Sequence, residues 1–83
     1  MDAAVDFYVT PLVQSGGVSW LVCKNALSHC VGIQDDIIAA TAQAIQMAQY
    51  HAANIAAQVH VRNAESAAWR TVWCSPNATP RFA

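Results

Sequence analysis

Apolar and polar residues alternate with a period of two in several short stretches, as expected for β-strands that bury one face. Residues 6–10 and 18–24 alternate before a long uncharged run, and residues 27–33 alternate again just ahead of it. Residues 58–62 and 69–74 alternate after that run. The pattern predicts three to five strands, divided by one segment of a different kind.

The dividing segment, the uncharged run at residues 37–61, predicts one helix followed by a strand. Asp35 or Asp36 is expected to cap the helix, because a carboxylate accepts hydrogen bonds from the first amide groups and suits the positive end of the helix dipole. No Gly or Pro interrupts the helix before about Ala57. A helical wheel places one apolar arc against the sheet: Ile38, Thr41, Ala42, Ile45, Ala48, Ala52, Ile55 and Ala56.

Together these elements predict an α+β fold, with one domain over residues 1–74. We expect a small antiparallel sheet of three to five strands, one long Ala-rich helix packed on one face, and the order ββ(β)αββ. The last strand is expected to place Trp69, Thr71 and Trp73 on the same face. The polar, proline-containing residues 75–83 are expected to form a loose C-terminal tail.

Charge is unusually scarce in this chain. Of its 83 residues, 55% are hydrophobic and only 11% are charged, against about 25% charged in a typical soluble domain. A small core and a surface poor in charge favour a homo-oligomer, and we expect a dimer. The net charge is −1, and the four basic residues are scattered along the chain. The absence of a basic cluster disfavours binding to nucleic acid or to a membrane surface.

The N-terminal residues 1–6 are acidic and lack the basic region of a signal peptide. The uncharged run contains several Gln residues, which would be costly in hydrocarbon. The three cysteines are an odd number without a secretory signal, so we expect reduced thiols and a cytoplasmic location.

The candidate chemical groups form no recognisable constellation. Cys23, His29, Cys30 and Cys74 lack the close spacing of a zinc knuckle, so the cysteines are interpreted as small buried hydrophobic residues. Cys23 and Cys30 lie on adjacent predicted strands and could meet. His29, His51 and His60 are the side chains that titrate near neutral pH, but no nucleophile or phosphate-binding motif accompanies them. We therefore expect no metal, no cofactor and no enzymatic activity.

The remaining helix surface is polar yet uncharged, which predicts a covered surface. The expected interface comprises Gln43, Gln46, Met47, Tyr50, His51, Asn54, His60, Arg62 and Arg70. This surface predicts a small non-enzymatic module that self-associates or binds another protein. The alternative is a sheet that binds single-stranded nucleic acid through its Trp and Arg residues. We favour placing the tryptophans in the core, because the small alanines need large partners to reach native packing density.

Several segments resemble a known family. They are residues 7–11, 17–22, 41–52 and 57–62, followed by Trp69 and Arg70. Their succession is similar to that of the small bacterial family catalogued as domain of unknown function 2188. The chain departs from that family in having Val18-Ser19 before Trp20 and in lacking the usual glycine of the last hairpin turn. The resemblance implies the fold described above, and no activity or site residues.

Overall fold

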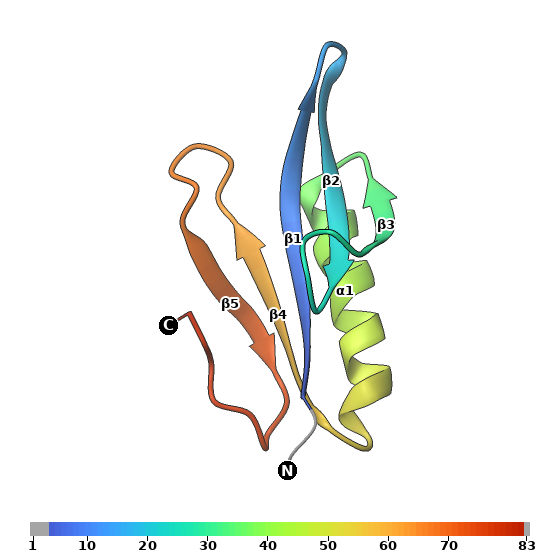
Figure 1. Ribbon diagram of the computed structural model, residues 1–83, viewed down its shortest axis with the longest axis vertical. Helices are drawn as coiled ribbons and strands as arrows, with labels where there is room; N and C mark the ends of the chain where they lie inside the picture. Colours follow the sequence, from blue (N-terminus) through green and yellow to red (C-terminus); the bar gives the residue numbers. More distant parts are fainter. Residues whose placement is uncertain (1–3, 83) are drawn as a thin grey trace.

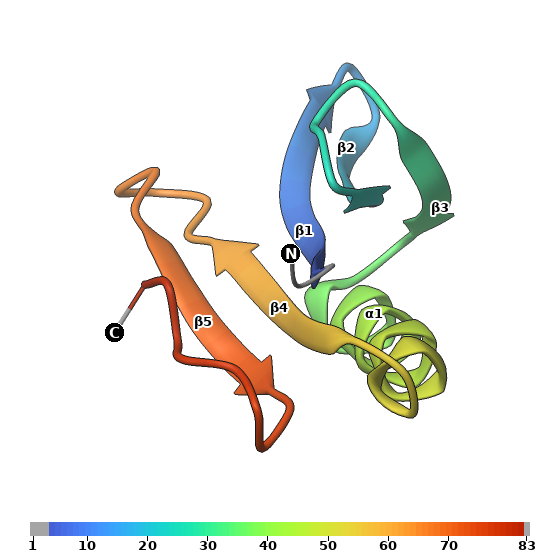
Figure 2. The same cartoon turned by 60° about the horizontal axis from the view of Figure 1, so that its bottom comes forward.

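The computed structural model describes residues 4–82. Its elements are β1 (Ala4–Gln14), β2 (Gly17–Lys24), β3 (Cys30–Gln34), α1 (Ile37–Ala52), β4 (Ala56–Arg62) and β5 (Trp69–Cys74). One helix lies against one face of a five-stranded sheet, as Figure 1 and Figure 2 show. The α+β class and the order of the elements are thus confirmed.

The sheet is mixed, so the expectation of a purely antiparallel sheet is wrong. The strand order is β3-β2-β1-β4-β5, in which β1 and β4 are parallel and every other pair is antiparallel. Two hairpin reversals make β3 run in the same direction as β1. Helix α1 then crosses the face of the sheet and returns the chain in that same direction, and a crossover of this kind joins parallel strands. Strand β4 therefore lies parallel to β1.

The helix packs on the sheet through alanines spaced every four residues. Ala40, Ala44 and Ala48 are fully buried against Val5, Phe7, Val9, Val22, Ala57 and Val59 of the sheet. The predicted apolar arc is therefore centred on the wrong residues, because Ile38 is 79% exposed. Alanine lets the helix backbone approach the sheet closely. Ile45 and Ile55 pack at the edge of this contact, and Ile37 and Ile38 are exposed. The helix face that packs on the sheet is therefore the one with the smallest side chains, which allows the closest approach, and not the one with the largest hydrophobic side chains.

The helix begins as predicted and ends earlier than predicted. The Asp36 side chain accepts a hydrogen bond of 2.7 Å from the Ala39 amide, which confirms the N-cap. The helix ends at Ala52 instead of near Ala57, and the Ile55 amide closes the following turn on the His51 carbonyl. Residues from Ala56 onward are needed to pair β4 with β1, so the tertiary pairing overrides the helical propensity of the alanines.

A register shift in β5 separates the tryptophans that were expected to share a face. Val59 pairs with Trp73 and His60 pairs with Thr71, so β5 carries one extra residue, Val72, between these two pairs. A bulge of this kind changes which face the side chains on either side of it occupy. Trp73, like Trp20, consequently packs against the core beneath the helix. Trp69 contacts Tyr8 on the opposite face.

The segment after β5, expected as a loose tail, folds back along the sheet over residues 75–82 (Figure 1). Thr71 and Phe82 form a backbone hydrogen bond of 2.8 Å, in which the Thr71 amide is the donor. The Gln58 side chain donates to the Thr79 carbonyl and accepts from the Arg81 amide. The sequence pattern missed this segment because its anchors are single polar contacts rather than a periodic apolar face.

Candidate interaction surface

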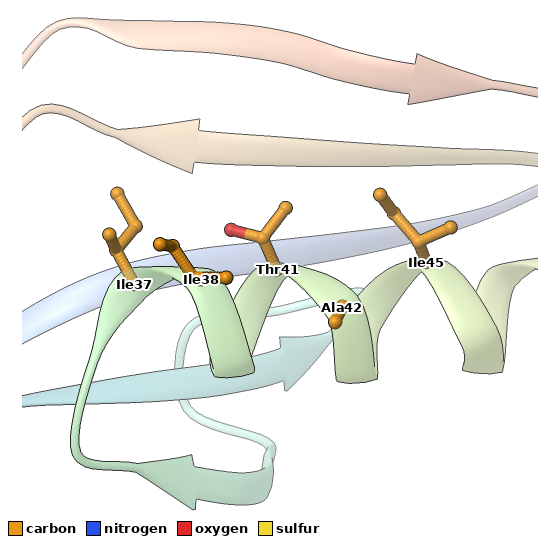
Figure 3. Close-up of a pocket in the computed structure, with 5 residues that line it drawn as sticks. All are labelled: Ile37, Ile38, Thr41, Ala42 and Ile45. Carbon is orange, nitrogen blue, oxygen red and sulfur yellow. The ribbon is translucent and has the colours of Figure 1, made fainter.

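An exposed apolar surface lies on the N-terminal half of the helix. Ile37, Ile38, Thr41, Ala42 and Ile45 line a shallow open depression there, which we call the α1 patch (Figure 3). Ile38 is 79% exposed and Ile37 is 38% exposed. Large exposed aliphatic side chains gathered on one helix face are typical of a surface that another chain covers.

The α1 patch continues toward the two last strands of the sheet. In Figure 3 the side chains of Ile37, Thr41 and Ile45 point toward β4 and β5. A second shallow depression beside Ile37 is lined by side chains of these strands and of the loop between them, Val61, Asn63, Ala68, Arg70 and Val72. Arg70 and the 43%-exposed Val72 therefore border the apolar surface.

The structure divides the residues that were predicted to form an interface. Gln46, Tyr50, Asn54 and Arg70 are exposed, whereas Gln43, Met47, His51 and Arg62 are half-buried. Met47 packs against the core, and Gln43 accepts a hydrogen bond of 2.9 Å from the Gln34 side chain. His60 is fully buried, so its assignment to a contact surface is wrong. Apart from Arg70, these residues do not line the two depressions that form the apolar surface.

A polar network occupies the sheet face opposite the helix. His60 Nε2 lies 2.8 Å from Asp6 Oδ1, and His60 Nδ1 lies 2.9 Å from the Thr71 hydroxyl. An ionised carboxylate only accepts hydrogen bonds, so Nε2 carries the proton that is donated to Asp6. The other ring nitrogen, Nδ1, is the hydrogen-bond partner of the Thr71 hydroxyl. Both ring nitrogens are thereby satisfied in a fully buried side chain.

The C-terminal segment covers this network. The Phe82 amide donates to the Thr71 hydroxyl oxygen over 2.9 Å, and the Phe82 ring meets the His60 ring edge-on. Arg81 donates to Asp6 Oδ2 at 3.2 Å and to the Tyr8 hydroxyl at 2.7 Å. The Asp–His–Thr order resembles a catalytic triad, but a fully buried histidine beneath Phe82 offers no access for a substrate. The arrangement is that of a satisfied structural network.

The network belongs to a row of side chains across the sheet. Successive strand partners are Cys30 with Cys23, Cys23 with Tyr8, Tyr8 with His60, and His60 with Thr71. Sequence reasoning missed this row because it depends on the parallel β1–β4 pair. A signal was present in Asp6, a lone carboxylate inside an apolar strand pattern, which needs a partner when it is partly buried.

The cysteine end of the row contains two thiols of different exposure. Cys23 is fully buried and its thiol donates to the Leu27 carbonyl at 3.6 Å, whereas Cys30 is exposed. Burial, and then the neighbouring Cys30 thiol, raises the pKa of the Cys23 thiol.

Between residues 4 and 82, no group of three or more His, Cys, Asp or Glu side chains is arranged to hold a metal ion. The helix of the described residues, α1, is not long and apolar enough to span a membrane.

No family model, no curated protein and no solved structure matches this chain. The resemblance to domain of unknown function 2188 therefore stays a prediction.

Proposed function

We propose that this chain is a small non-enzymatic module that self-associates, and that the α1 patch is the surface on which a second copy docks. The observation that carries the proposal is the exposure of Ile38 beside Ala42 and Ile45, on a helix without a charged residue. In a two-fold dimer, the same patch faces itself.

A second copy is favoured as the partner because the surface is complementary to itself. The helix from Ile37 to Ala52 contains no Lys, Arg, Asp or Glu, so two copies of it meet without repulsion between like charges. Ile38, Ala42 and Ile45 follow the spacing of four and three residues by which helices pack side by side. The small side chains of Thr41 and Ala42 allow two helices to approach closely, and the isoleucines fill the space on either side of them.

The proposal is tested by a charge placed at Ile38 and a matched charge placed elsewhere. Val13 is 78% exposed, nearly the same as Ile38, but it lies at the end of the β1–β2 hairpin that projects beyond the sheet (Figure 1). Sedimentation equilibrium of the wild type at micromolar concentration should show a dimer. Ile38→Asp should be monomeric, and Val13→Asp should associate like the wild type.

The size of the effect follows from buried area. Full burial of an isoleucine contributes about 1.5–3 kcal/mol, and a two-fold interface contains Ile38 twice. Because most of each side chain is exposed in the monomer, Ile38→Asp should raise the dimer dissociation constant about a hundredfold or more. A wild type that is monomeric at every concentration, or an Ile38→Asp variant that associates normally, would contradict the proposal.

The single-strand-binding alternative has less support from the geometry. Trp69 stacks on Phe82 and meets Tyr8 edge-on, so these rings are engaged with one another. Of the basic residues beside them, Arg81 is paired with Asp6, and Arg62, the strand partner of Trp69, donates to the Ala67 carbonyl. The other two tryptophans pack against the core on the helix side. The tryptophan rings are thus engaged within the chain, and base stacking needs free ring faces.

A further inference from the structure

We infer that Cys23 and Cys30 form a redox-active dithiol, which a small-molecule disulfide converts into an intramolecular Cys23–Cys30 disulfide. The two residues are cross-strand partners in the antiparallel β2–β3 pair, immediately after a register shift between Val22 and Cys23. The Cα atoms of such partners lie about 4.5–5.5 Å apart, within the range of about 4.4–6.8 Å that a disulfide requires. Both side chains project from the same face of the sheet, because directly opposed residues do so.

The two thiols are neighbours in the reduced protein, because their residues are cross-strand partners. Burial raises the pKa of the Cys23 thiol, and the neighbouring Cys30 thiol raises it further. The Cys23 thiol donates to the Leu27 carbonyl. The Cys30 thiol also donates to the Gly32 carbonyl at 3.2 Å. The third cysteine, Cys74, lies on β5 and is separated from β2 by the two intervening strands β1 and β4, so it is a natural internal control.

Their different exposure assigns a role to each thiol. Cys30 is exposed on the edge strand β3 and is accessible to a dissolved disulfide. Its thiolate attacks one sulfur of that disulfide, the sulfur–sulfur bond breaks, and one small thiol leaves with a proton. Cys23 is shielded from solvent and has a raised thiol pKa, so it is a poor first nucleophile.

The second step forms the intramolecular disulfide. Cys23 gives up its proton and attacks the Cys30 sulfur of the mixed disulfide, which releases the second small thiol. The protein loses two electrons and two protons, and the small-molecule disulfide gains both to become two thiols. The new bond closes the loop of residues 24–29 and removes the hydrogen bond from the Cys23 thiol to the Leu27 carbonyl. Oxidation therefore changes the loop beside Asp6, whose amide is held by the Asn25 side chain.

The test uses the full chain in mixtures of reduced and oxidised glutathione. Samples are quenched with acid, the free thiols are labelled with a maleimide, and peptides are assigned by mass spectrometry. In the wild type and in Cys74→Ala, the label at Cys23 and at Cys30 should be lost together, with one intramolecular disulfide between them. In Cys23→Ala, Cys30 should stop at the mixed disulfide with glutathione.

A second probe avoids dependence on the variants and on the redox buffer. Phenylarsine oxide, which bridges two neighbouring thiols, should bind the reduced wild-type chain once and protect both Cys23 and Cys30 from the maleimide. The inference is overturned if Cys30 of the wild type stops at the mixed disulfide, or if the disulfide joins two chains. It is equally overturned if the arsenical protects neither thiol of the pair.

Discussion

Replacement of Thr71 by valine tests the polar network on the sheet face opposite the helix. The Thr71 hydroxyl makes two contacts of 2.9 Å, one with His60 Nδ1 and one with the Phe82 amide. Valine keeps nearly the same shape but can neither donate nor accept a hydrogen bond. In the variant, His60 remains fully buried and remains bonded to Asp6 through Nε2, and its Nδ1 is left without a partner.

The cost follows from these contacts. A buried polar atom that loses its partner destabilises a protein by about 1–3 kcal/mol, whereas the half-exposed Phe82 amide can bond to water instead. We therefore expect Thr71→Val to lower the free energy of unfolding by about 2 kcal/mol. For a domain of this size the melting temperature should fall by about 8–16 °C. Thr71→Ser, which keeps the hydroxyl, should recover most of the loss.

The assay is urea unfolding at one fixed protein concentration, followed by far-ultraviolet circular dichroism. Thr10→Val is the matched control. Thr10 is almost fully buried in β1. Within the described residues, its hydroxyl forms no side-chain hydrogen bond of the kind that Thr71 forms. Thr10→Val should therefore change the free energy of unfolding by less than about 0.5 kcal/mol. Equal unfolding midpoints for Thr71→Val and Thr10→Val would refute the reasoning, because the network would then contribute nothing.

Three further predictions concern the helix cap, the packing of β3 and the buried thiol. Asp36→Ala should cost about 1 kcal/mol in urea unfolding, because Asp36 accepts the Ala39 amide; equal loss in Asp35→Ala would contradict this cap. A Cβ added at Gly32 would lie 2.6 Å from the Gln43 side-chain nitrogen, and Gln43 moves aside only by giving up its hydrogen bond with Gln34, so Gly32→Ala should cost about 1 kcal/mol. That penalty should vanish in a Gln43→Ala background, and a purely additive double variant would disprove the clash. Because burial and the Cys30 thiol raise the pKa of Cys23 in the folded chain, its stabilising contribution is complete below the unfolded thiol pKa of about 8.5 and is lost as pH rises through the higher folded value. The urea concentration at the unfolding midpoint should thus fall more between neutral and alkaline pH in the wild type than in Cys23→Ala. A larger fall in the variant would contradict a raised pKa of Cys23 in the folded chain.

Local pattern was sufficient to predict the elements but insufficient to predict how they pair. Alternation located the strands around Val22, Val59 and Thr71, and Asp36 located the start of the helix. The parallel β1–β4 pair depends on where the helix crossover returns the chain, and no residue in either strand specifies that. The alternating pattern of β5 likewise gives no sign of the bulge at Val72, although the bulge determines which face of the sheet Trp73 occupies.

The candidate surface was expected on the same helix but on another side of it. A helical wheel weighs hydrophobicity, and it therefore placed Ile38 inward and Met47 outward, the reverse of what the structure shows. The useful signal was the regular spacing of Ala40, Ala44 and Ala48, which marks the face that can approach a sheet most closely. Reading size as well as hydrophobicity would have assigned Ile38 to the exposed side.

Contact between two copies through the α1 patch is tested most directly by isotope-filtered NMR on a mixture of labelled and unlabelled chains. The account predicts intermolecular nuclear Overhauser effects between the methyl groups of Ile38 and Ile45 and the same helix of the other copy. If a dimer forms and its intermolecular signals come from another surface, such as the edge strand β3, or if no intermolecular signals appear at all, the account is wrong.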